Sequence, residues 1–253
     1  MFLEVHELND VYRNNGLYIK WLFPRLAGVI TTNKFKGDFL HKELGVPRNK
    51  LICQQNTTDM DMFRVDASSD EAREKLGLPK NKRIILYTGQ LYDWKGRDTL
   101  LGMHNFLGPQ ESLYIVGGDG KNLEMVNTVI VKSRPHPEMP LWLRAADILI
   151  LPHSGKFSIA RNEASPVKLF EYMASARPVV VADLPSMREI VDDSMVWFFE
   201  PDNPRALVSI ARLALSNQEE AEMRIKRAAE EVKNYTWEIR ALNILCFVKK
   251  NAH

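Results

Sequence analysis

Two apolar runs, Asp147-Ile-Leu-Ile-Leu151 and Pro178-Val-Val-Val-Ala182, flank the stretch Glu163-Ala-Ser-Pro-Val-Lys-Leu-Phe-Glu171. Each run is almost continuously apolar, as expected of a strand that is buried on both faces of a sheet. Between them, Ser165 is a suitable N-cap and Pro166 suits the first position of a helix. A strand, a helix and a second strand predict a βαβ unit, and therefore a parallel sheet.

The helix predicted here has one carboxylate before its first turn and another inside it. We expect it to end near Ala176, so Glu163 lies outside the helix and Glu171 more than one turn inside. The N–H groups of Val167 and Lys168 lie between them, at the positive end of the helix dipole. This arrangement favours a phosphate with hydroxyl-rich groups beside it, as in a sugar nucleotide. Two solvated carboxylates near a helix start are the alternative interpretation.

An apolar stripe on this helix is expected to face the core, with Lys168 and Glu171 on the opposite face. The stripe consists of Leu169, Phe170, Met173 and Ala174.

Strand-like and helix-like segments alternate over most of the chain, which predicts a doubly wound α/β domain with helices on both faces of a parallel sheet. The expected strands are Arg83–Thr88, Ser112–Val116, Val129–Val131, Asp147–Leu151, Pro178–Ala182 and Met195–Phe199. The other expected helices are Asp98–Leu107, Pro137–Ala146, Pro185–Val191, Asn203–Ser216, Glu219–Tyr235 and Trp237–Lys249.

The first 65 residues are expected to form a smaller unit, with a boundary near Val65. Its expected elements are the strands Phe2–Val5, Ala27–Thr31 and Lys50–Gln54, and the helix Lys34–Leu44, which Gly45 ends. Three short strands are marginal unless they pack on something else. The segment Asn15–Val29 is rich in large apolar side chains, and we expect it to expose an apolar patch that self-associates, docks a partner or contacts a membrane. A core helix beneath the terminal helix is the alternative.

Composition excludes several classes of protein. A net charge of +2, with both signs mixed, gives no argument for nucleic acid as a partner. Cys53 and Cys246 have neither metal-site nor disulfide-framework spacing, which favours two reduced thiols in a cytoplasmic protein. No run approaches the roughly 20 apolar residues of a membrane-spanning helix.

Several motifs, in order along the chain, resemble the retaining GT-B glycosyltransferases of family 4. The pair Glu163 and Glu171, with seven residues between them, is followed by Tyr172-Met-Ala-Ser-Ala-Arg-Pro178. The other matching segments are Asn56-Thr-Thr-Asp59 with Phe63, Tyr87-Thr-Gly-Gln-Leu91 with Lys95-Gly96, Ile115-Val-Gly-Gly-Asp119, Ala145-Ala-Asp-Ile-Leu-Ile-Leu-Pro152 and Tyr235-Thr-Trp237. The resemblance implies a GT-B fold with two Rossmann-like domains.

The same resemblance implies an incomplete acceptor-binding domain. Residues 1–65 match only the last third of that domain in the family, residues 66–235 match the donor-binding domain, and residues 236–253 form a helix that packs back toward the N-terminal part. We therefore expect a truncated or split chain, with a partner chain or self-association supplying the rest.

The resemblance also assigns roles to residues. Lys95, Glu163 and His6 are the expected catalytic residues: Lys95 stabilises the departing nucleoside diphosphate and Glu163 contacts hydroxyls of the donor sugar. Glu171 is expected to bind the ribose. The other expected donor-binding residues are Gly89, Gln90, Gly117, Gly118, Asp119, Arg134, Ser165, Pro166, Val167 and Lys168.

One position departs from the family. Gln90 stands where the family often has Arg, so Arg97 or Lys168 is expected to supply the second charge.

Asp59 resembles a hinge aspartate, with an Asx-type turn as the alternative. His153, Ser154 and Lys156 lie in the loop near the expected sugar position.

These observations predict a metal-independent retaining glycosyltransferase without a cofactor. It would transfer a sugar from a nucleotide diphosphate sugar to a glycan or lipid-linked hydroxyl, in the cytoplasm or at the inner face of the membrane. A non-catalytic nucleotide-sugar-binding subunit and a GT-B sugar-nucleotide epimerase or hydrolase are the alternatives.

Overall fold

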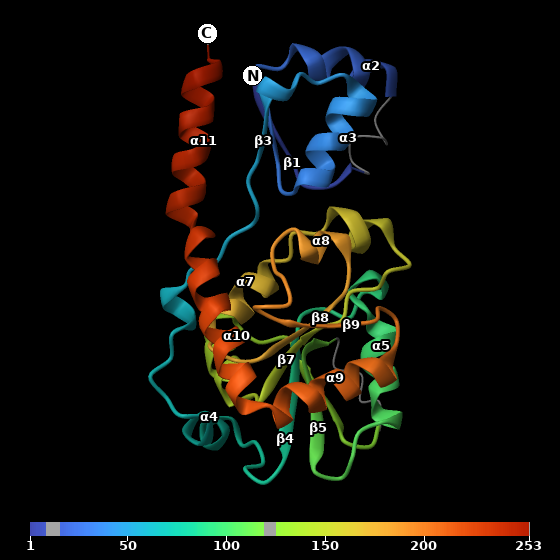
Figure 1. The fold of residues 1–253 in the computed structure, drawn as a ribbon, viewed down its shortest axis with the longest axis vertical. Coiled ribbons are helices and arrows are strands. Elements are labelled where there is room, and N and C mark those ends of the chain that lie inside the picture. The colour runs from blue at the N-terminus through green and yellow to red at the C-terminus, as the bar shows by residue number, and fades with distance from the viewer. Residues whose placement is uncertain (9–15, 119–124, 253) are drawn as a thin grey trace.

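The computed structural model describes residues 1–8, 16–118 and 125–252, which form two α/β bodies beside one long C-terminal helix (Figure 1). The N-terminal body contains a three-stranded parallel sheet in the order β1-β2-β3. Its elements are β1 (Phe2–Val5), α2 (Gly16–Leu22), β2 (Gly28–Thr31), α3 (Lys34–Leu44) and β3 (Leu51–Cys53). Asn33 caps α3. Gly45 ends it with a φ of 67°, and this end is the one that the sequence predicts.

The N-terminal body has a small apolar core of its own. Ile19, Phe23 and Leu26 are buried in it, packed with residues of the sheet and of α3. The prediction that Asn15–Val29 exposes its large apolar side chains is therefore wrong for these three residues. The sheet and α3 cover them, so the alternative of burial beneath the terminal helix is also wrong. Trp21 is half exposed, and Arg25 lies over its ring.

The larger body contains a six-stranded parallel sheet in the order β6-β5-β4-β7-β8-β9. Its strands are β4 (Arg83–Thr88), β5 (Glu111–Gly118), β6 (Thr128–Lys132), β7 (Ile148–Leu151), β8 (Val179–Ala182) and β9 (Trp197–Phe199). The chain moves outward from β4 to β6 and then returns to place β7 beside β4. The carboxyl ends of β4 and β7 therefore form the switch point at which doubly wound sheets bind ligands.

Helices flank this sheet (Figure 1). They are α4 (Ser69–Leu76), α5 (Arg97–Gly102), α6 (Met139–Ala145), α7 (Val167–Ala174), α8 (Pro185–Arg188), α9 (Pro204–Ser216) and α10 (Gln218–Glu231). The predicted α/β class and parallel sheet are confirmed. Helix α4 was not predicted, although Ser68 and Glu71 form a capping box at its start, a pattern that is readable in sequence.

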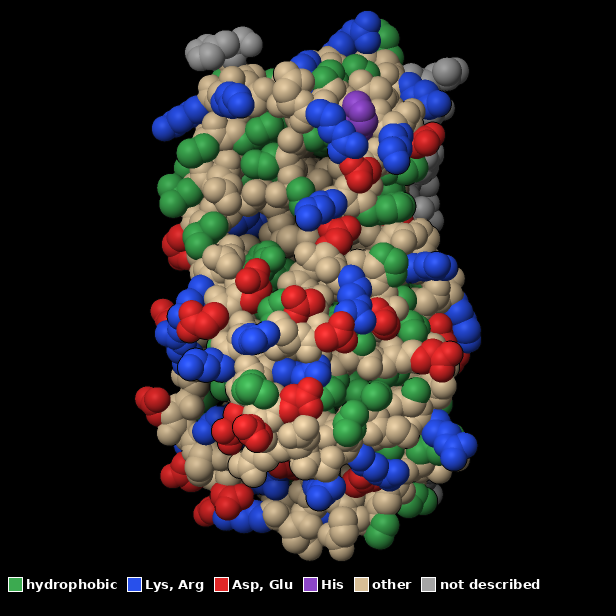
Figure 2. Space-filling view, in the orientation of Figure 1, with side chains coloured by type: hydrophobic (Ala, Val, Ile, Leu, Met, Phe, Trp, Pro, Cys, Tyr) green, Lys and Arg blue, Asp and Glu red, His purple; other side chains and the backbone are tan. Residues whose placement is uncertain are grey.

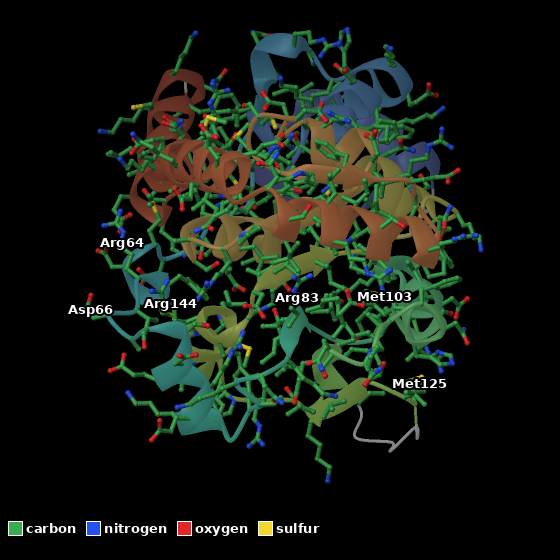
Figure 3. All side chains as sticks on the ribbon, turned by 60° about the horizontal axis from the view of Figure 1, so that its bottom comes forward. Arg64, Asp66, Arg83, Met103, Met125 and Arg144 are labelled. Atoms are coloured by element: carbon green, nitrogen blue, oxygen red, sulfur yellow. The ribbon has the colours of Figure 1, made fainter. Side chains whose placement is uncertain are left out.

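A hydrogen bond joins the larger body to the segment that precedes it. Arg144 of α6 donates from Nε to the carbonyl of Ala67 at 2.6 Å, and Figure 3 shows Arg144 near the connecting segment at Arg64 and Asp66. The same view looks onto the end of the sheet where Arg83 begins β4.

The C-terminal helix α11 (Trp237–Asn251) extends from the larger body along the N-terminal body (Figure 1). Arg240 forms an ion pair with Glu4 of β1 and donates to the carbonyl of Gln55. Farther along, the ring of Phe247 packs edge-on against Phe2, with centroids 6.0 Å apart.

The surface carries charges of both signs over the whole face seen in Figure 2. Within the described part of the chain, no helix combines the length and the apolar character that crossing a membrane requires.

Candidate functional site

A cavity of about 360 Å³ lies between the two bodies, above the carboxyl ends of β4 and β7. The N-terminal body contributes charged and polar side chains to its wall, and the larger body contributes the segments that follow β4 and β7. The lining residues are His6, Glu7, Thr32, Lys36, Asn56, Tyr87, Thr88, Trp94, Lys95, Leu151, His153, Ile159, Glu163, Ala164, Ser165, Pro166, Val167 and Lys168.

Glycines let the loops at the switch point approach one another closely. Gly96 has a φ of 82°, and a Cβ there would lie 1.7 Å from the carbonyl oxygen of Pro152. Gly117 has a φ of 116°, and a Cβ there would lie 2.8 Å from the oxygen of Gly89. Any side chain at Gly96 would therefore push the loop after β4 away from the loop after β7.

Lys95 lies in this loop and lines the cavity. Its ammonium group is 5.0 Å from the ring centre of Trp94 and 5.2 Å from that of Tyr92, which is within cation–π range. Burial, and secondarily the charge of Lys168, lower the pKa of Lys95. Lys95 and Lys168 are two cations that repel each other at the cavity wall, and a bound diphosphate would stabilise both charges.

Arg97 or Lys168 was expected to supply a second positive charge near Lys95. Of these two residues, Lys168 lines the cavity. Arg97 instead lies 3.7 Å from Asp93 and is not part of the lining, and Gln90 is not part of it either.

Glu163 is buried in the cavity wall at the end of a π-helical turn, Ile159–Glu163. Its Oε2 accepts a hydrogen bond from the N–H of Leu8 at 3.2 Å, and the hydroxyl of Ser158 donates to Oε1 at 3.4 Å. The carboxylate is therefore fixed by both bodies.

Glu171 is also buried, with 2% of its surface exposed, so the face of α7 opposite the apolar stripe is covered as well. Lys168 donates to its Oε2 at 2.8 Å, and His136 Nε2 lies 3.0 Å from its Oε1. Neither glutamate is a solvated surface carboxylate. Phe63 packs edge-on against the His136 ring, with centroids 5.8 Å apart.

The start of α7 differs from the prediction. Ser165 is not the N-cap: Pro166 occupies that position, and the helix begins at Val167. The Ser165 hydroxyl instead accepts from the N–H of Asn56 at 2.9 Å and donates to Gln55 Oε1 at 2.6 Å. These partners come from the segment that joins the two bodies.

The helix also ends earlier than expected, at Ala174, and Ala176 has a left-handed φ of 54°. Inside it, the Tyr172 hydroxyl accepts from the N–H of Thr88 at 2.8 Å. This bond holds α7 on the carboxyl end of β4.

Two histidines lie in the cavity wall, one of them exposed and the other buried. The His6 ring is exposed and lies 3.2 Å from Glu4 Oε1. His153 is buried against Trp94, and burial, then the charge of Lys95, lower its pKa to about 3. His153 Nδ1 has no hydrogen-bond partner among the described residues, so a neutral imidazole faces the site unsatisfied.

Other predicted residues lie outside the cavity lining. Gly89 N–H donates to the Val116 carbonyl at 2.7 Å, so this glycine joins neighbouring strands. Gly117 and Gly118 pack against neighbouring backbone and side chains, and Arg134 is exposed after β6. Asp119 falls outside the described residues. Ser154 and Lys156 do not contribute to the lining.

Asp59 forms the Asx-type turn named as its alternative. Its Oδ1 accepts from the N–H groups of Asp61 at 3.1 Å and Met62 at 3.3 Å.

The sequence interpretation missed Thr32, Lys36 and Asn56, all in the cavity wall. The polar run Thr31-Thr-Asn33 at the end of a buried strand was a readable signal for Thr32, since the carboxyl ends of parallel strands carry binding residues.

Comparison with known proteins places this geometry in a family. The profile described as Glycosyl transferases group 1 matches residues 68–231, well over half of the chain. The chain belongs to this family. A D-inositol 3-phosphate glycosyltransferase of Xylanimonas cellulosilytica is 26% identical over 187 residues, covering 66% of this chain and 43% of that protein. TuaH of Bacillus subtilis, named for teichuronic acid biosynthesis, is 23% identical, covering 85% of this chain and 56% of the relative.

Solved structures share the fold over nearly the whole chain. Sucrose-phosphate synthase of Thermosynechococcus elongatus has a TM-score of 0.77 at 19% identity, covering 98% of this chain and 67% of its own. Anabaena HepE in complex with UDP-glucose has a TM-score of 0.80 at 16% identity, with coverages of 98% and 72%. The expected GT-B-type fold is confirmed. The chain spans about half of the length of the curated relatives that it matches.

Proposed function

We propose that this chain carries the donor site of a retaining, metal-independent glycosyltransferase. It would transfer a sugar from a nucleoside diphosphate sugar to a hydroxyl of a glycan or lipid-linked acceptor. The observation that carries the proposal is that Lys95, Lys168 and the buried Glu163 line one cavity at the switch point, with the buried Glu171 bonded to Lys168. Family membership and the UDP-glucose bound to HepE support it.

The chemistry follows from these charges. When the bond between the anomeric carbon and the diphosphate breaks, negative charge develops on the leaving phosphate oxygens. Lys95 and Lys168 stabilise that charge, together with the free N–H groups at the start of α7. The acceptor oxygen forms the new glycosidic bond, and its proton leaves with the diphosphate or to solvent.

The two glutamates divide the donor between them. Glu171, held by His136 and Lys168 beyond the cavity wall, would accept hydrogen bonds from the ribose. Glu163, which faces the N-terminal body, would accept hydrogen bonds from the sugar. Neutral His153 offers its free Nδ1 to a hydroxyl or phosphate in the same space.

Donor turnover tests this proposal. Purified protein should release nucleoside diphosphate from UDP-, GDP- or ADP-glucose faster when a hydroxyl acceptor is present, and the Lys95→Met variant should not. Donor binding without turnover would favour a non-catalytic nucleotide-sugar-binding subunit. Release of free 2-epimerised sugar would favour the epimerase alternative.

A further inference from the structure

The cavity contains a third lysine that the proposed donor chemistry does not use. Lys36 of α3 is 1% exposed and lines the cavity from the N-terminal body. Its ammonium group donates to the carbonyl oxygen of His6 at 2.6 Å and to the hydroxyl of Thr32. Both acceptors are neutral, and an ammonium group has three donors.

No carboxylate in the described part of the chain lies within ion-pair distance of this cation. Buried lysines are rarely left without an opposite charge, because desolvation of the ammonium group is costly. Burial lowers the pKa of Lys36 to about 8, and the largest effect in the opposite direction comes from the charge of Glu163.

The unmatched positive charge at this place belongs to the Lys36 side chain and not to the backbone N–H groups at the start of α3. The N–H groups of Lys34 and Phe35 donate to Glu189 of the larger body at 2.8 and 3.3 Å. The N–H of Lys36 donates to Asn33 Oδ1 at 3.1 Å. The helix end is therefore already satisfied, and the side-chain ammonium group is the unmatched feature.

Lys36 is also separate from the two lysines assigned to the donor. Lys95 and Lys168 belong to the larger body and Lys36 to the smaller one. A donor diphosphate held on the larger body leaves Lys36 facing the second substrate.

We propose that Lys36 and the Thr32 hydroxyl bind an anionic group, a phosphate or a carboxylate, carried by the acceptor near the hydroxyl that receives the sugar. This inference rests on the proposed function. It assigns the acceptor to the anionic, hydroxylated compounds, and it gives the buried cation the direct ion-pair partner that none of the described residues provides.

The test is calorimetric titration of the whole chain, saturated with UDP, with glucose 6-phosphate, glucuronic acid and glucose. UDP occupies the diphosphate site, so the phosphate probe cannot compete for it. We expect at least one anionic probe to bind about ten- to a hundredfold more tightly than glucose, which corresponds to one charge-assisted hydrogen-bonded contact. The two anionic probes distinguish a phosphate acceptor from a carboxylate acceptor.

Lys36→Met should remove this preference while leaving UDP affinity unchanged. Lys42→Met is the matched control, because Lys42 is exposed on the same helix. Lys36→Gln is a second variant that keeps a donor for His6 and Thr32 without the charge. If Lys36→Met fails to fold, Lys36→Gln and the wild-type preference still decide the matter.

Three results would overturn the inference: equal binding of the three probes, binding of none, or an unchanged preference in a folded Lys36 variant. Failure of UDP itself to bind would instead contradict the proposed function, so the two failures are distinguishable.

Discussion

The carboxylate of Glu163 accepts a hydrogen bond from the N–H of Leu8, at 3.2 Å, across the boundary between the two bodies. Similar bonds join Asn33 to the carbonyl of Asn162 at 2.6 Å. The side chain expected to contact the donor sugar is therefore positioned by residues that lie more than 150 positions away in the chain. The geometry of the site depends on the closed arrangement of both bodies.

We expect the two buried glutamates to affect different parts of the donor. Glu171→Gln should weaken UDP binding by about 1.5–3 kcal/mol, because it removes charge-assisted hydrogen bonds to the ribose. Glu163→Gln should leave UDP affinity within about twofold, but reduce sugar-dependent binding or turnover by tenfold or more. Calorimetric titration with UDP and UDP-glucose measures both. Equal loss of UDP affinity in the two variants would contradict this division.

Gly96 provides a test of the loop geometry. Gly96→Ala should lower the free energy of unfolding by about 2–5 kcal/mol, because a left-handed alanine costs about 1–2 kcal/mol and overpacking against Pro152 adds about 1–3 kcal/mol. Gly45→Ala is the matched control, since Gly45 has a φ of 67° and no atom lies within 4 Å of its Cβ position. Urea denaturation compares them. Equal losses would show that the contact with Pro152 is unimportant.

His153 predicts a particular pH dependence of stability. Its pKa is lowered from 6.5 to about 3 in the folded protein, so the unfolded chain binds the proton first as pH falls. The stabilisation that depends on neutral His153 is therefore complete above pH 6.5 and is lost progressively between 6.5 and 3, by up to about 4–5 kcal/mol.

His153→Phe should flatten this part of the stability curve relative to wild type, as followed by urea denaturation between pH 7 and pH 4. His41→Phe serves as the control, because His41 is half-buried, contacts the Val46 carbonyl and lies outside the cavity. If the stability curves of wild type and His153→Phe run parallel, the assignment of His153 as a buried neutral imidazole is wrong.

Local sequence was enough to predict most of the secondary structure. The strands were predicted to within two residues at each end because continuous apolar runs are typical of them, and the end of α3 was predicted because Gly45 marks it. The loops at the switch point followed from the βαβ order.

The partners of individual side chains could not be predicted in the same way. Ser165 has the sequence context of an N-cap, yet its hydroxyl bonds to residues 109 and 110 positions away. Lys36 resembles any surface lysine of an amphipathic helix, yet it is buried and its ammonium group bonds to the His6 carbonyl and the Thr32 hydroxyl. Such positions are determined by tertiary packing, about which local periodicity carries no information.

The most direct test of the central claim is titration of the protein with UDP, GDP and ADP at moderate salt. We expect at least one nucleoside diphosphate to bind with a dissociation constant below about 1 mM, and Lys95→Met to weaken it about tenfold or more, as loss of one charge-assisted contact implies. The exposed Lys42→Met variant should bind as wild type does. If no nucleoside diphosphate binds below millimolar concentration, or if Lys95→Met binds as tightly as wild type, the assignment of this cavity as a donor site is wrong.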